Sequence, residues 1–182
     1  MKKLIIPLLF IAAPIINASS FSSEKPSKED VINTHNDFRN KHKLPPLTWS
    51  YELTKYAQQW VNHLAQTKNC TMTHRPDDET SPFQQINGEN LYWSSALEYE
   101  DGTRKVENIT AKEIIETWAS EEDFYNYETN TCMDDADCGH YTQIVWHETK
   151  EVGCAIAVCE DKSQVWACNY SPRGNYLGEW PY

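Results

Sequence analysis

The sequence predicts one α+β domain, with helices packed on a small antiparallel central sheet. Three segments with helical spacing of apolar residues come first, and two strand-like runs follow at residues 152–159 and 164–170. The polar connector at residues 160–163 is short, which indicates an antiparallel hairpin. Helices followed by a late run of strands are typical of the α+β class.

Each predicted helix has a polar residue where it should begin. Ser27 with Asp30 is a candidate capping box before a helix that should end by residue 44, ahead of two prolines. Ser50 precedes a second helix with an apolar stripe over residues 53–64. Thr110 with Glu113 should cap a third helix. Residues 67–108 contain several prolines and glycines and lack a clear period, so we expect loops there.

The first 18 residues have the features of a secretory signal. Lys2 and Lys3 precede an apolar run over residues 4–16, and Ala18 supplies the small residue expected at a cleavage site. The run is shorter than the roughly 20 residues of a membrane-spanning helix. We therefore expect residues 1–18 to be removed and the mature chain to be secreted, extracellular and not membrane-spanning. Residues 19–27 should form a flexible lead-in, and residues 28–182 the folded domain.

The mature chain would be strongly acidic. The formal net charge of the full sequence is −11, and removing residues 1–18, which carry two lysines and no acids, makes it −13. Such a surface repels phosphate backbones, so nucleic acid is not an expected partner.

Six cysteines follow the predicted signal: Cys70, Cys132, Cys138, Cys154, Cys159 and Cys168. An even number in a secreted chain predicts three disulfides, and the absence of any C-x-x-C pair argues against a metal cluster. In the predicted hairpin Cys154 falls near Cys168, so this bridge is geometrically easy. Cys132 and Cys138 could close their own short loop, which leaves Cys70 with Cys159.

The sequence has neither of the hydrolase motifs G-x-S-x-G and H-E-x-x-H, and it has no phosphate-binding loop or dinucleotide-binding fingerprint. Two segments still suggest the rim of a cleft. His140 follows a glycine and opens the apolar run GHYTQIVW at residues 139–146. Glu89 and Asn90 likewise follow a glycine in GENLY at residues 88–92. By itself, a histidine beside an apolar run is more often structural than functional.

These segments resemble the motifs of the CAP superfamily, which groups cysteine-rich secretory proteins, antigen 5 and pathogenesis-related proteins. GHYTQIVW at 139–146 is similar to the first CAP signature, and ACNYSPRGNY at 167–176 to the second. HNDFR at 35–39, LPPLTW at 44–49 and GENLY also fit. Residues 125–140 and the ending GNYLGEWPY resemble the plant branch, the pathogenesis-related proteins of class one. The resemblance covers residues 28–182.

The resemblance implies a three-layer α-β-α sandwich with a central cleft. The family's two histidines and two acids fall at His74, Glu89, Glu121 and His140. Two positions depart from a clean match: Arg75 stands where the family often has serine, and Glu122 adjoins Glu121. The implied disulfides are Cys70–Cys159, Cys132–Cys138 and Cys154–Cys168.

Several functions are compatible with this cleft. His74 and His140 could bind Zn²⁺ or another divalent cation, and a metal-dependent hydrolase or protease is one alternative. A purely structural hydrogen-bonded cluster is another, and we do not expect a turnover enzyme or a required cofactor. The function that we expect first, which the resemblance implies, is binding of sterols or other lipids, with Tyr92, Trp93, Tyr141 and Trp146 as candidate pocket residues or simply core. The resemblance also implies a defence or host-interaction role, including contact with a host or microbial surface component. A last alternative is that residues 172–182 are released as a signalling peptide.

Overall fold

The structure is a computed structural model, and it describes residues 25–182. The predicted signal at 1–18 and most of the lead-in at 19–27 lie outside the described residues. Within residues 25–182, no helix combines the length and the apolar character needed to cross a bilayer.

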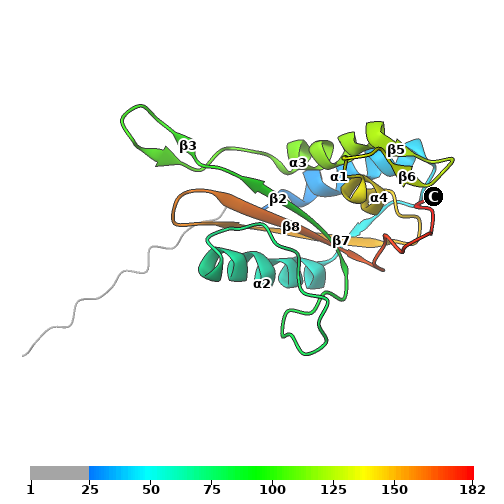
Figure 1. The fold of residues 1–182 in the computed structure, drawn as a ribbon, viewed down its shortest axis with the longest axis horizontal. Coiled ribbons are helices and arrows are strands. Elements are labelled where there is room, and N and C mark those ends of the chain that lie inside the picture. Colours follow the sequence, from blue (N-terminus) through cyan, green and yellow to red (C-terminus); the bar gives the residue numbers. More distant parts are fainter. Residues whose placement is uncertain (1–24) are drawn as a thin grey trace, which may run out of the picture.

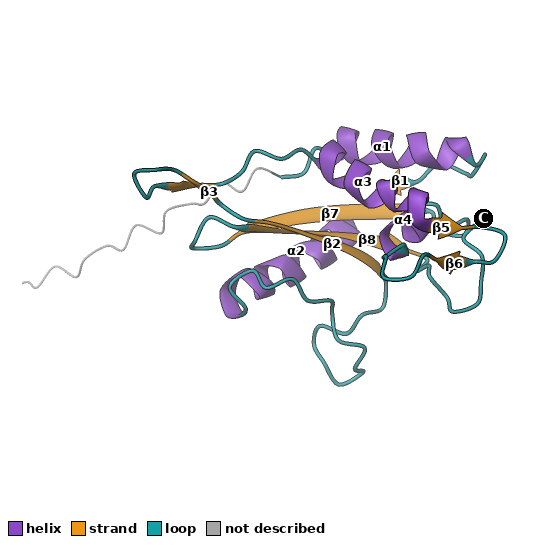
Figure 2. Cartoon of the chain, turned by 45° about the horizontal axis from the view of Figure 1, so that its top comes forward, coloured by secondary structure: helices purple, strands orange, loops and turns teal. Residues whose placement is uncertain are grey.

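Three layers make up the domain, as the resemblance implies (Figure 1). Helix α2 (Tyr51–Thr67) covers one face of the central sheet. Helices α1 (Lys28–Lys41), α3 (Ala111–Ala119) and α4 (Gly139–Ile144) lie on the other face, and Figure 2 shows the same separation from a second angle. A 3-10 helix, η1 (Ser120–Phe124), continues directly from α3.

The central sheet has four strands in the order β1-β7-β8-β2. Strands β7 (Glu151–Val158) and β8 (Gln164–Ser171) form the predicted hairpin, and β2 (Gly88–Ser94) pairs antiparallel with β8. The two-residue strand β1 (Thr48–Trp49) pairs with β7 in parallel. The sheet is therefore mixed rather than wholly antiparallel, because β1 approaches from the α1–α2 connection on the far edge.

The predicted helix caps are largely present. Ser27 and Ser50 each accept a hydrogen bond from the backbone N–H three residues on, at the starts of α1 and α2. Thr110 and Glu113 form a complete reciprocal capping box at α3. Each cap satisfies a backbone donor that has no partner inside the helix, which fixes where the helix begins.

Alternation along the strands divides the core between the two faces. Val152, Cys154 and Ile156 of β7 pack toward α1 and α3, whereas Ala155 and Ala157 pack toward α2. Small residues on the second face let α2 approach closely. Gly153 shows how closely, because a Cβ there would lie 2.4 Å from the backbone nitrogen of Thr54.

Several elements lie where the sequence predicts only loops or gives no helical signal. Strand β2 and helix α4 are the two that matter for the site. Two small hairpins complete the fold: β3 (Leu97–Glu98) with β4 (Arg104–Lys105), and β5 (Tyr125–Asn126) with β6 (Thr131–Cys132). The β3–β4 hairpin projects away from the body of the domain (Figure 1).

All six cysteines are paired, in the combination that the resemblance implies. The disulfides are Cys70–Cys159, Cys132–Cys138 and Cys154–Cys168. Cys154 and Cys168 lie directly opposite each other in the β7–β8 register. Cys70–Cys159 joins the end of α2 to the end of β7, so it ties one helical layer to the sheet.

Candidate functional site

The candidate site residues lie around the end of the sheet where edge strand β2 begins. Glu89 and Asn90 are neighbours on this strand, so their side chains point to opposite faces. Glu89 shares the α2 face with Leu91, and Asn90 faces the layer that contains α4. Strand β2 thus contributes one polar side chain to each side of the sheet at the same point.

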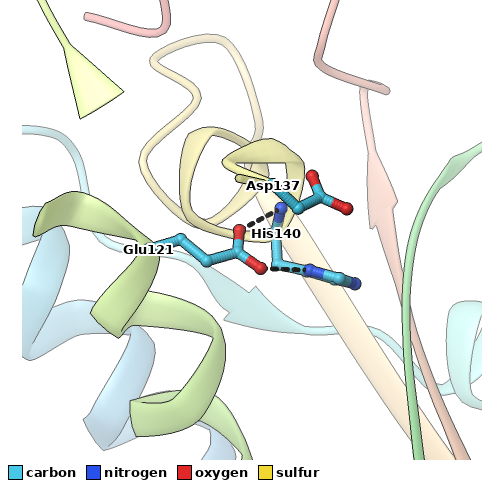
Figure 3. Close-up of side chains that lie close together, drawn as sticks. All are labelled: Glu121, Asp137 and His140. Carbon is cyan, nitrogen blue, oxygen red and sulfur yellow. Dashed lines mark hydrogen bonds and ion pairs between the residues drawn. The ribbon is translucent and has the colours of Figure 1, made fainter. Parts of the chain in front are cut away.

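On the α4 side, Glu121 binds the ring and the backbone N–H of His140 (Figure 3) and also the backbone N–H of Tyr141. One carboxylate oxygen accepts from His140 Nδ1 at 2.5 Å. The other accepts from the backbone N–H groups of His140 and Tyr141, at 2.9 and 3.1 Å. The ring of Trp118 stacks parallel to the imidazole, with 9° between the planes and 5.8 Å between centroids. Glu121 is therefore the carboxylate that engages His140, while Glu122 accepts from the Tyr141 hydroxyl.

On the α2 side, Glu89 holds His74 in a similar way. One oxygen of Glu89 accepts from His74 Nδ1 at 2.9 Å and from the backbone N–H of Arg75 at 3.2 Å. The other accepts from the side-chain amide of Asn169 at 3.3 Å. In both pairs a glutamate binds the imidazole and the backbone N–H of the residue that follows the histidine.

This shared geometry fixes the tautomer of both histidines. A carboxylate at Nδ1 favours the proton on that nitrogen, so in the neutral ring Nε2 carries a free lone pair. Among the described residues, Nε2 of His74 and of His140 has no hydrogen-bond partner. Each imidazole is thus oriented by a carboxylate and has one nitrogen available to a ligand.

Glu89 is a fully buried carboxylate, and Arg75 is the cation that compensates its charge. The Glu89 side chain has no exposed area, and Arg75 Nε lies 3.5 Å from one of its oxygens. The Arg75 guanidinium also lies over the ring of Tyr56, 3.6 Å from its centroid. The sequence showed Arg75 only as a departure from the family pattern. Its role here is to make a buried carboxylate tolerable beside His74.

The hydrogen bond to Glu89 raises the pKa of His74 above its usual value, although partial burial opposes the effect. The negative charges of Glu89 and Asp137 also raise this pKa. Asp137 belongs to the loop just before α4. Its negative charge thus acts on a histidine whose own partner, Glu89, lies on the α2 face. Asp137 is a residue that the sequence analysis did not select.

The four predicted residues come together as two pairs rather than as one tight cluster. Glu121, Asp137 and His140 form a more compact group. Each offers one ligand atom, and these three atoms all lie within 4.8 Å of one another. His74 and Glu89 do not belong to this group. The sequence signal that could have pointed to Asp137 is its place in the acidic loop MDDAD, two residues before Gly139-His140.

A buried series of hydrogen bonds supports the backbone of His140. The Asn90 side-chain amide donates to the backbone oxygen of His140 at 3.1 Å and to the Tyr170 hydroxyl at 3.2 Å. Tyr170 in turn donates to His35 Nε2 at 2.9 Å, and His35 Nδ1 donates to the oxygen of Val31 at 2.8 Å. These hydrogen bonds link α1, β8, β2 and α4 through one network.

The aromatic residues proposed for a lipid pocket are dispersed. Tyr141 and Trp146 are each 1% exposed and belong to the buried core, whereas Trp93 is 45% exposed near the end of β2. A separate cavity of about 390 Å³ lies at the opposite end of the sheet, and none of the four candidates lines it. Its apolar lining residues are Pro26, Val106, Ile109, Ala111, Ile156, Val158 and Trp166.

Comparisons with known proteins agree with the fold and the motifs. A pathogenesis-related protein PR-1 of Medicago truncatula is 37% identical over 172 residues, covering 94% of this chain and 87% of the relative. Among solved structures, BmVAL-1 superposes with a TM-score of 0.63 and 28% identity, covering 85% of this chain and 81% of that one. NaASP2, solved with Zn²⁺, superposes with a TM-score of 0.59 and 21% identity, covering 85% of this chain and 84% of that one.

The family model "CAP: Cysteine-rich secretory protein family" matches residues 32–170. This stretch contains all four candidate site residues, the six cysteines and the whole of the central sheet except the last residue of β8. The chain therefore belongs to the CAP family, and plant pathogenesis-related proteins of type 1 are among its relatives.

Proposed function

We propose that this chain acts outside the cell as a binding protein whose central cleft takes a divalent cation such as Zn²⁺. The observation that carries the proposal is the pair of imidazoles, each with Nδ1 bound by a carboxylate and Nε2 free. Histidines that bind metals almost always donate their other ring N–H to a carboxylate, a carbonyl or water. The three disulfides and the acidic surface fit an extracellular cation binder.

The donor set fits the chemistry of zinc. Imidazole nitrogen and carboxylate oxygen are both zinc ligands, and sites with few protein ligands keep positions open for water or a second molecule. In this cleft His74 and His140 would offer nitrogen, while Glu89 and Glu121 orient the rings. NaASP2, which shares the fold, has been solved with Zn²⁺, and this also supports the choice of ion.

Calorimetric titration with Zn²⁺ tests the proposal. The wild-type protein should bind Zn²⁺, and the double variant His74→Ala/His140→Ala should lose the binding. His63→Ala/His147→Ala is the matched control, because it removes two histidines outside the cleft and should bind like the wild type. Equal titrations for the two double variants, or no heat from the wild type, would refute the proposal.

The same variants address the alternative of a metal-dependent hydrolase or protease. An enzyme of this kind would cleave a labelled casein or an ester substrate when loaded with Zn²⁺ and would lose this activity in His74→Ala/His140→Ala. We propose a binding protein rather than an enzyme. Hydrolysis that disappears in the double variant and remains in the control would favour the enzyme.

A second candidate function, binding of a sterol or another lipid, is supported by the cavity of about 390 Å³. Its volume falls within the range of small-molecule sites in proteins, and apolar and polar residues contribute about equally to its lining. Val158 and Gln164 of the cavity pair with each other at the hairpin end of the sheet, whereas Glu89 pairs with Asn169. Five residues of strand, about 17 Å, separate the two places.

Because of this separation, lipid binding and cation binding should respond to different substitutions. Val158→Arg would place a charge in the cavity, so it should abolish binding of radiolabelled cholesterol and leave Zn²⁺ binding intact. Ile86→Arg makes a similar change at a position that is 61% exposed and outside the cavity, so it should have no effect. Cholesterol binding that survives Val158→Arg would exclude this cavity.

A further inference from the structure

The geometry points to Asp137 as a direct ligand of the cation, at the His140 end of the cleft. This inference rests on the proposed cation binding and specifies which groups provide it. One ring nitrogen of His140, one oxygen of Asp137 and one oxygen of Glu121 lie within 4.8 Å of one another. Zinc–ligand bonds of about 2 Å place neighbouring ligand atoms somewhat closer together than this, so only a small side-chain movement is needed.

One carboxylate oxygen of Asp137 is available to a cation. Its Oδ1 accepts from the backbone N–H of Gly139 at 2.9 Å, and among the described residues its other oxygen has no hydrogen-bond partner. The side chain is exposed, so it can turn toward a cation without breaking buried contacts. In Figure 3 the Asp137 carboxylate and the far end of the His140 ring both point away from Glu121.

Glu121 has no such freedom. Its two oxygens accept three hydrogen bonds, from the His140 ring and from the first backbone N–H groups of α4. Moving Glu121 onto a metal would break these bonds and release the ring that it orients. Glu121 is therefore a positioning residue, and Asp137 is the carboxylate that contacts the cation.

The position of His74 explains why the cation would be held mainly from one side. His74 is absent from the compact group, and its contacts are with Glu89 on the α2 face of the sheet. Asp137 nevertheless acts electrostatically on His74. A cation bound by Asp137 and His140 would therefore act on His74 through its charge, as Asp137 does, without needing His74 as a ligand.

The test compares two substitutions in the same disulfide-closed loop. Asp137→Asn keeps the amide-oxygen acceptor for Gly139 but removes the charge and one ligand oxygen. Asp135→Asn makes the same charge change two residues away, where the positive φ of 63° is one that asparagine tolerates. Zn²⁺ affinity by calorimetry should fall at least about tenfold in Asp137→Asn and stay within about twofold in Asp135→Asn.

The visible absorption of bound Co²⁺ provides a second measurement, since it depends on which atoms contact the metal. The Co²⁺ spectrum should change in Asp137→Asn and remain unchanged in Asp135→Asn. Wild-type Zn²⁺ binding that Asp137→Asn leaves intact would overturn this inference but not the proposed function. No Zn²⁺ binding by the wild type would overturn both. Equal losses in the two loop variants would also overturn the inference, since they would show a general effect of charge.

Discussion

His35 shows how one buried side chain couples the stability of the domain to pH. Its ring is fully buried and satisfied at both nitrogens, by Val31 and Tyr170. Nδ1 donates and Nε2 accepts, so the network requires the neutral ring. Burial, and to a smaller extent the positive charge of Arg39, lower the pKa of His35 from 6.5 to about 4, although the hydrogen bond to Val31 opposes them. The native state thus resists protonation at a pH where the unfolded chain accepts it.

The sign of the pH effect follows from this difference. Above pH 6.5 the ring is neutral in both states and contributes no pH dependence. Between pH 6.5 and about 4 the unfolded state binds more protons, so the free energy of unfolding falls as the pH falls. The loss attributable to His35 should reach about 3 kcal/mol.

Urea denaturation between pH 4 and 7 measures this loss. His35→Gln should be less stable than the wild type at pH 7, because the network is disturbed. It should also show a shallower decline toward pH 4, because glutamine does not ionise. Parallel curves for the two proteins would contradict the assignment.

At the scale of elements, the start of α3 depends on Thr110. The hydroxyl of Thr110 accepts from the backbone N–H of Glu113, and the Glu113 carboxylate accepts from the backbone N–H of Thr110. Thr110→Ala should lower the free energy of unfolding by about 1 kcal/mol, which corresponds to a fall of roughly 3 °C in melting temperature.

Thr110→Ser is the control, because serine keeps the capping hydroxyl and should remain close to the wild type. Both variants can be compared by thermal unfolding followed by circular dichroism. A Thr110→Ala protein as stable as Thr110→Ser would show that the cap contributes little.

The sequence predicted the elements whose signals are local and missed those whose signals are tertiary. The caps at Ser27, Ser50 and Thr110 and the β7–β8 hairpin could be predicted from neighbouring residues. Strand β2 could not, because Gly88-Glu89-Asn90 opens it with residues that disfavour strands. It is a strand because β8 provides hydrogen-bond partners along its whole length. Helix α4 is only six residues long and is held by Glu121 at its first turn.

The candidate site residues show the same division between local sequence signals and tertiary ones. Motif matching identified His74, Glu89, Glu121 and His140, and the structure places them as two carboxylate–imidazole pairs. Motif matching could not show that the two pairs approach from opposite faces of a strand, since that arrangement depends on the β2–β8 register. Asp137 escaped notice because its proximity to His140 depends on the turn between them rather than on a motif.

At the scale of the whole molecule, the Cys70–Cys159 disulfide connects two layers across 89 residues of sequence. Cys132–Cys138 closes a loop with a separation of only 6 residues. In the chain-entropy account, a crosslink stabilises the fold by restricting the unfolded chain, and longer loops gain more. The long-range bond should contribute about 4–5 kcal/mol and the short one about 2 kcal/mol.

The stabilities contributed by the two disulfides can be compared by replacing each cysteine pair with serine and measuring guanidinium denaturation. Cys70→Ser/Cys159→Ser should cost about 2 kcal/mol more than Cys132→Ser/Cys138→Ser. Equal costs would show that the entropic difference is offset by local packing around Cys70 and Cys159.

The C-terminal segment is also part of the packed molecule. Tyr182 stacks on His42 and on Tyr127, and its hydroxyl contacts that of Tyr141 at 3.1 Å. The backbone oxygen of Pro181 accepts from the His147 backbone N–H at 2.6 Å. Release of residues 172–182 as a peptide would have to break these contacts.

Because Glu89 and Asn90 occupy adjacent positions of β2, this strand should tolerate neither an insertion nor a deletion of one residue. Adding or deleting a single codon within Gly88–Ser94 would exchange the faces to which these two side chains point, and both halves of the cleft would be lost in one event. The projecting β3–β4 hairpin carries no such constraint. Length variation among descendants of this sequence should therefore accumulate in the hairpin and be purged from the strand beside it.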